Sequence, residues 1–95
     1  MTDPLARLRA DFLARCARDL TELRRLDPGD PTVGLIVHRL AGAAGSFGYE
    51  ELGAVAGRLD DRARSGAITG AELAPLLEAL ADLGRAAGQP ASPDY

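Results

Sequence analysis

Apolar residues recur every three or four positions along four successive segments of the chain, a spacing that places them on one face of an α-helix. The first segment opens with Asp3 and Pro4, an N-cap acid followed by a proline at the first helical position. It ends in the sequence DPGDP, residues 27–31, whose last two residues repeat that start signal for the second segment. The core face predicted for the first segment consists of Leu5, Leu8, Phe12, Cys16, Leu20, Leu23 and Leu26.

The other three segments are bounded by glycines and by one capping box. The second is expected to stop near Gly48 and the third at Ser65-Gly66, whereas Thr69 and Glu72 form a capping box before the fourth. Pro75 removes a backbone hydrogen bond there, so the fourth helix starts either at Thr69 or a few residues later. The predicted core residues are Val33, Ile36, Val37, Leu40, Ala44 and Phe47, then Leu52, Val55, Ala56, Leu59 and Ala63, then Leu73, Leu76, Leu77, Leu80 and Leu83.

Short connections between helices predict antiparallel neighbours, and therefore an all-α, up-down-up-down four-helix bundle over residues 1–87. Residues 88–95 lack periodicity, contain two prolines and are expected to form a loose tail. The chain of 95 residues is long enough for one domain, and its 46% hydrophobic residues are mostly alanine and leucine, which favour helix over strand. The predicted fold is one helical domain.

Charge and cysteine content exclude several classes of protein. The net charge is −3 and no basic run exceeds Arg24-Arg25, which argues against a nucleic-acid partner. No apolar stretch approaches the roughly 18 residues of a membrane span, and the polar N-terminus does not resemble a signal peptide, so we expect a cytoplasmic protein without membrane association. A single cysteine allows neither an intrachain disulfide nor a cysteine-rich metal site.

The one histidine, His38, is predicted to face solvent. At about 100° per residue it lies roughly 160° from Leu40, nearly opposite the core face of the second segment. The positions around it on the helix surface are small or apolar: Gly34, Leu35, Ala41, Gly42 and Gly45. Three helical glycines would cost roughly 2–3 kcal/mol relative to alanine. They are explained either by access of another protein to His38, which we favour, or by tight packing of a further element or a compositional bias toward small residues.

Few chemistries suit a single exposed histidine. A metal site needs several ligands, a hydrolase triad needs a nucleophile on a strained turn, and GAAGSFG, residues 42–48, matches no phosphate-binding loop. A neutral imidazole, with an ordinary pKa near 6.5, is itself a nucleophile and can form a covalent phosphoryl intermediate. His38 is therefore the candidate nucleophile.

The stretch VHRLAGAAGSFGYEELGAVAGRLD, residues 37–60, resembles the histidine-containing phosphotransfer (HPt) domains of multistep bacterial phosphorelays. The family pattern is His-x-Leu-Lys-Gly, small residues, a glycine ten positions after the histidine, a leucine four further on and a closing Leu-Glu. The matching positions are His38, Leu40, Gly42, Ala43, Ala44, Gly48, Leu52 and Leu59. Two positions depart from it: Ala41 replaces the usual lysine and Asp60 replaces the closing glutamate.

The resemblance implies a phosphocarrier rather than an enzyme. His38 would accept a phosphoryl group from the phosphoaspartate of a receiver domain and pass it to another, in a pathway that includes a hybrid histidine kinase. The receiver would supply Mg²⁺, so no cofactor of its own is expected. Arg39 lies about 100° round the helix from His38, and its long side chain would reach partway toward a phosphoryl group. The docking surface implied for the receiver comprises Gly34, Leu35, Arg39, Ala41, Gly42 and Gly45.

Three alternatives remain open. Ala41 favours an interaction module that docks on a receiver or self-associates without phosphotransfer, whereas the intact His38 argues against it. A phosphoacceptor domain cut from a chemotaxis-type kinase is the second, although the starting Met1 and the loose tail lead us to expect a free-standing monomer. A metal- or haem-binding bundle is the third.

Overall fold

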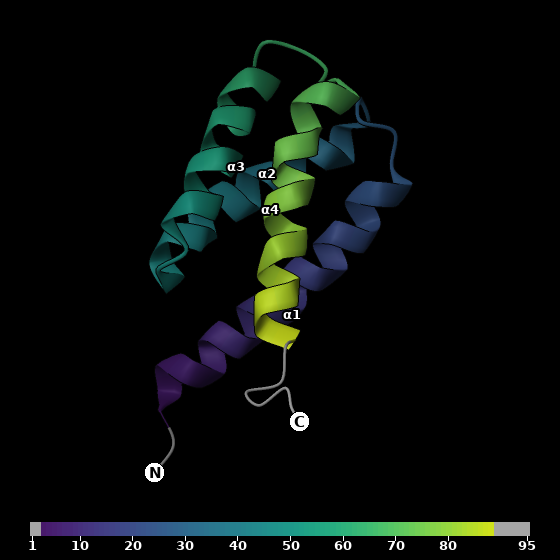
Figure 1. Cartoon of the computed structure of the whole chain (residues 1–95). Coiled ribbons are helices and arrows are strands. Elements are labelled where there is room, and N and C mark those ends of the chain that lie inside the picture. The colour runs from purple at the N-terminus through teal and green to yellow at the C-terminus, as the bar shows by residue number, and fades with distance from the viewer. Residues whose placement is uncertain (1–2, 89–95) are drawn as a thin grey trace.

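Four α-helices and one short 3-10 helix account for most of residues 3–88, the part of the chain that this computed structural model describes (Figure 1). They are α1 (Pro4–Arg25), α2 (Pro31–Ala44), α3 (Glu50–Ala63) and α4 (Gly70–Gly88), with η1 (Gly45–Phe47) between α2 and α3. No strand occurs in these residues, and the prediction of an all-α fold with four helices is confirmed. Gly88, expected to open the tail, instead closes α4, and residues 89–95 lie outside the described part.

Helix α1 starts as the sequence predicts and extends further than its core contacts. The Asp3 carboxylate accepts a hydrogen bond from the backbone N–H of Leu5 at 3.0 Å, and Pro4 occupies the first turn. Leu5 and Leu8 are 59% and 50% exposed, so their predicted place in the core is wrong. With 22 residues, against 14 in α2, α1 is longer by about 12 Å. Its first turns therefore extend past the rest of the bundle (Figure 1).

Helix α2 carries the most completely buried face of the bundle. Its predicted core residues up to Ala44 are all buried, and Phe47 in η1 is half-buried against them. The α-helix ends at Ala44, earlier than predicted, and η1 continues the chain to Gly48. Gly48 has φ 87°, a left-handed conformation that glycine adopts without steric cost. This turn reverses the chain into α3, whose buried residues are Leu52, Ala56 and Leu59.

Helix α4 begins at the capping box despite its internal proline. The Glu72 carboxylate accepts a hydrogen bond from Thr69 N at 2.9 Å, and Thr69 Oγ1 accepts one from Glu72 N at 3.2 Å. The helix therefore starts at Gly70 and tolerates Pro75 in its second turn. Ile68, in the loop before it, is buried in the core, although the sequence pattern did not include it.

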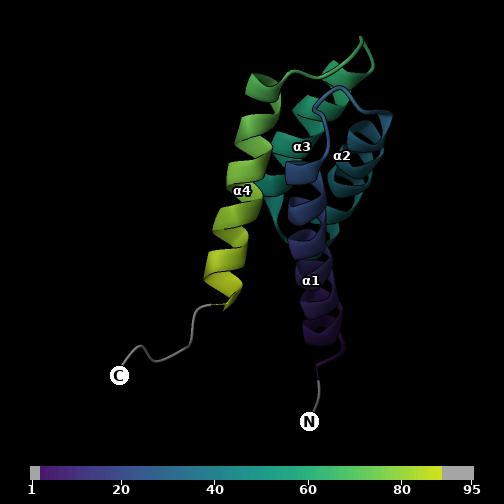
Figure 2. The ribbon, with the colours of Figure 1, turned by 90° about the vertical axis from the view of Figure 1, so that its right-hand side faces the viewer.

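Small residues bring α2 and α3 close together, and Figure 2 shows these two helices side by side. Helix α1 packs chiefly against α4. A Cβ placed on Gly53 of α3 would lie 3.6 Å from Cβ of Ala44 and 3.5 Å from the backbone nitrogen of Gly45. The rings of Phe47 and Tyr49 stack on Phe12 of α1, with centroids 5.0 and 5.7 Å away, and link the two pairs. The close approach of Gly53 to Ala44 sets the spacing between α2, which carries His38, and α3.

The loops that precede α2 and α4 lie at the same end of the bundle, at the top of Figures 1 and 2. A Cβ placed on Gly29 would lie 3.6 Å from Cβ of Ala67. Among the described helices, none is both long enough and apolar enough to cross a bilayer.

Candidate functional site

His38 projects from the middle of α2, and its side chain is 71% exposed. Val37 and Leu40 of the same helix are buried, so the helix turns its apolar face inward and presents the imidazole to solvent. The prediction that His38 faces solvent is confirmed. The imidazole is open to a reaction partner that approaches from outside the bundle.

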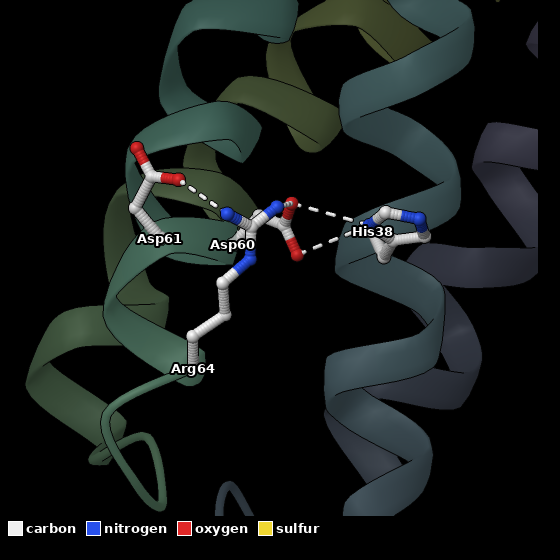
Figure 3. A network of polar contacts seen from close by, with 4 residues as sticks. All are labelled: His38, Asp60, Asp61 and Arg64. Atoms are coloured by element: carbon white, nitrogen blue, oxygen red, sulfur yellow. Dashed lines mark hydrogen bonds and ion pairs between the residues drawn. The ribbon is translucent and has the colours of Figure 1, made fainter.

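Asp60 of α3 holds one ring nitrogen of His38 (Figure 3). Its Oδ2 and Oδ1 lie 3.2 and 3.3 Å from Nδ1. An ionised carboxylate only accepts hydrogen bonds, so the contact requires a proton on Nδ1. In the neutral ring the other nitrogen, Nε2, then keeps its lone pair and is the one able to attack an electrophile.

Arg64, the C-cap residue directly after α3, contacts the same carboxylate. Its Nη2 lies 3.3 Å from Asp60 Oδ2, and its Nη1 lies 3.6 Å from Oδ1 of Asp61. The Asp60 side chain is only 14% exposed, whereas that of Arg64 is 69% exposed. The mostly buried carboxylate of Asp60 is therefore shared between the imidazole of His38 and the guanidinium group of Arg64 (Figure 3).

Asp60 stands out in the sequence as a departure from the family pattern, but its contact with His38 was not predicted. The two residues are 22 positions apart on different helices, and only the packing of α2 against α3 brings them together. A signal was present: Asp60 lies one turn after Ala56 and directly after Leu59, both buried, at the edge of the apolar stripe of α3. A polar residue at such an edge faces the neighbouring helix.

The glycines around His38 are not required by packing within the described part of the chain. A Cβ at Gly34, Gly42 or Gly45 would meet no atom within 4 Å beyond its immediate surroundings. Gly45 lies in η1 and not in an α-helix, so the expectation of three glycines inside α2 is wrong. The two in α2 still cost roughly 1–2 kcal/mol relative to alanine. Tight packing against another described element therefore does not explain these glycines. This favours the interpretation that they give a partner access to His38.

Two further residues of the predicted docking surface differ in exposure. Leu35 is 70% exposed, a large apolar side chain one turn before His38. Ala41 is half-buried and packs against the core. The surface around the imidazole therefore carries few long side chains and is partly apolar, which suits contact with another protein.

Arg39 is directed to α1 and not to the imidazole. Its Nη2 donates a hydrogen bond to Oδ1 of the buried Asp19 at 2.7 Å. The expectation that its side chain extends partway toward a phosphoryl group on His38 does not match this position. The other carboxylate oxygen of Asp19 is buried and has no hydrogen-bond partner among the described residues.

Cys16 lies in the core, as predicted, and Asp19 is buried three residues further along α1. Burial, and then the negative charge of Asp19, raise the pKa of its thiol to about 11. A thiol of this kind is neither a ready nucleophile nor a ready metal ligand. Within residues 3–88, no three side chains of His, Cys, Asp or Glu gather in a way that could hold a metal ion.

Comparison with known proteins identifies the family. The family model described as the Hpt domain matches residues 7–86, which is most of the chain. Neither the curated proteins nor the solved structures contain a match to the chain. The matched range includes the whole of α2 and α3, with His38 and Asp60, and most of α1 and α4. The chain therefore belongs to the Hpt domain family, the histidine phosphotransfer modules of phosphorelays.

Proposed function

We propose that His38 accepts a phosphoryl group from the phosphoaspartate of a receiver domain and passes it to a second receiver in a multistep phosphorelay. The observation that carries this proposal is the exposed imidazole whose Nδ1 lies against Asp60, at 3.2 Å. Family membership supports this reaction class, and the contact of Nδ1 with Asp60 supports Nε2 as the atom that reacts.

The proposed transfer is an in-line displacement at phosphorus. The lone pair of Nε2 attacks the phosphoryl group, the P–O bond to the receiver aspartate breaks, and that bond's electron pair returns to the carboxylate. As the P–N bond forms, the ring becomes positively charged and keeps its proton on Nδ1, where the Asp60 carboxylate stabilises it. In the reverse direction the phosphoryl group leaves Nε2 for the next receiver, and the ring returns to the neutral state.

The receiver would contribute the groups that this chain lacks. Its acidic pocket would hold Mg²⁺, and that ion would neutralise charge on the phosphoryl oxygens during transfer. It would dock over Gly34, Leu35, Gly42 and Gly45, where added side chains would obstruct its approach. We further propose that the chain acts as a cytoplasmic monomer, with a hybrid histidine kinase upstream, and that it carries phosphoryl groups without a cofactor of its own.

Incubation with a phosphorylated receiver domain tests the proposal. We expect a label on the chain that is lost in acid, resists base and is absent from His38→Gln. The rival function is a docking module without phosphotransfer, which the replacement of the family's lysine by Ala41 favours. Binding to the receiver without transfer of label would establish that rival and overturn the proposal.

A further inference from the structure

Asp60 is the carboxylate that faces His38, and Arg64 contacts it at 3.3 Å, about as closely as the imidazole does at 3.2 Å. The described groups that face this pair are few. They are Asp60 and Asp61 of α3 and Arg64 directly after that helix, while the nearest charged residue of α2, Arg39, pairs with Asp19 of α1. Arg64 is therefore the cation best placed to alter what Asp60 does for the ring.

We propose that Arg64 is a positioning residue that slows phosphoryl loss from His38. It does so by pairing with the Asp60 carboxylate and so weakening the interaction of that carboxylate with the ring. This inference rests on the proposed function, because it concerns the lifetime of the phosphohistidine. Arg64 places a positive charge near the site from the end of α3, in a chain whose α2 carries Ala41 and not a lysine three residues after the histidine.

The direction of the effect follows from the charge of the ring. Phosphohistidine loses its phosphoryl group most readily when Nδ1 is protonated, since the imidazole then departs as a neutral ring. Asp60 favours that protonated ring, because its carboxylate accepts the Nδ1 hydrogen bond. Arg64 donates to the same carboxylate and opposes a positive ring, so it disfavours the labile form.

The distances and exposure of Arg64 also indicate how strong its effect on the ring should be. Its two contacts, 3.3 Å to Asp60 and 3.6 Å to Asp61, are long for charge-assisted hydrogen bonds. Its side chain is 69% exposed, so its charge is partly screened by solvent. The expected effect is therefore modest and sensitive to salt.

The test measures the lifetime of the phosphorylated chain. The wild type and variants are phosphorylated with phosphoramidate, which transfers its phosphoryl group to Nε2 and releases ammonia, and the loss of label is followed against pH. We expect Arg64→Gln to shorten the lifetime at neutral pH about two- to fivefold, the effect of removing one partly screened charge near the ring. The curve of lifetime against pH should move to higher pH, and high salt should reduce the difference.

Matched variants separate this role from a structural one. Arg64→Lys keeps the charge and should stay close to wild type. Arg58→Gln removes an exposed arginine of α3 for which the described residues show no ion pair, and it should leave the lifetime unchanged. In an Asp60→Asn background the effect of Arg64→Gln should shrink, because the shared carboxylate is gone.

Two results would overturn the inference: equal lifetimes for Arg64→Gln and Arg58→Gln, or an equal effect of Arg64→Gln with and without Asp60. Failure of the proposed function looks different. In that case a phosphorylated receiver transfers no label to the wild type, whatever the lifetimes of chemically phosphorylated variants.

Discussion

At the residue scale, the contact between His38 and Asp60 decides which nitrogen of the ring is available for chemistry. The exposure of His38 could be predicted from the sequence, because the apolar positions of α2 define its buried face. The contact with Asp60 could not, because helix periodicity says nothing about which residue of another helix lies opposite. The same limit explains Arg39, whose partner Asp19 is 20 positions away on α1.

Asp60→Asn tests the contact with the ring. Asparagine presents both an acceptor and a donor to Nδ1, so it no longer specifies the Nδ1–H form or stabilises a positive ring. We expect the rate of transfer from a phosphorylated receiver to fall about tenfold, the low end of the effect of losing a hydrogen bond to a charged group. ¹⁵N NMR of the imidazole should show less of the Nδ1–H tautomer. Glu78→Gln, an exposed change on α4, is the control, and equal rates for the two variants would refute the role of Asp60.

Gly42→Ala tests whether the bare surface serves access. A Cβ at Gly42 meets no atom within 4 Å, so alanine should raise the free energy of unfolding by about 0.5–1 kcal/mol, measured by urea denaturation. Transfer from a phosphorylated receiver should become slower, because the added methyl group lies on the docking surface.

Gly84→Ala is the matched control for that variant. Gly84 is an exposed glycine of α4, and a Cβ there also meets no atom within 4 Å. It should stabilise the fold by a similar amount and leave transfer unchanged. If both variants transfer at the wild-type rate, the glycines of α2 do not serve access.

At the scale of single elements, local signals predicted helix starts better than helix ends. The caps at Asp3, Asp30 and Thr69 all form, because each depends on residues within one turn. The end of α2 was less predictable, since the 3-10 turn up to Gly48 depends on how η1 meets α3. Pro75 lies within α4, since a favourable cap before it keeps the first turn helical.

The capping box predicts a pH dependence of stability. The hydrogen bond from the backbone N–H of Thr69 is the main cause that lowers the pKa of the Glu72 carboxyl below its ordinary value. A lowered pKa in the folded state stabilises the fold above about pH 4.3, and this contribution is lost as pH falls through the lowered value. Wild type should therefore exceed Glu72→Gln in urea midpoint at pH 7, and the two should converge at lower pH. A difference that persists unchanged at pH 3 would contradict the assignment.

At the scale of the whole molecule, one hydrophobic core joins all four helices, and α3 packs against α4 as well as against α2. Helices α2 and α3 form one pair and α1 packs mainly on α4, so the ion pair of Arg39 with Asp19 is a direct polar link between them. The four-helix fold could be predicted from the apolar pattern alone. The apolar pattern does not show how far one helix extends past its neighbours. Leu5 and Leu8 were therefore wrongly placed in the core.

Arg39→Ala should destabilise the bundle by about 1.5–3 kcal/mol, because it leaves the buried carboxylate of Asp19 without its partner. The measurement is the free energy of unfolding in urea at pH 7. Adding Asp19→Asn to this variant removes the unpaired charge and should recover part of the loss. A double variant as unstable as the sum of the two single variants would show that the ion pair contributes nothing.

The central claim is that Nε2 of His38 carries the phosphoryl group. It is tested most directly by phosphorus–nitrogen correlation NMR on ¹⁵N-labelled chain that has been phosphorylated by a receiver domain. We expect one phosphorus signal coupled to Nε2 of His38, and none in His38→Gln. A phosphoryl group on Nδ1 or on another residue, or no transfer from the receiver at all, would contradict it.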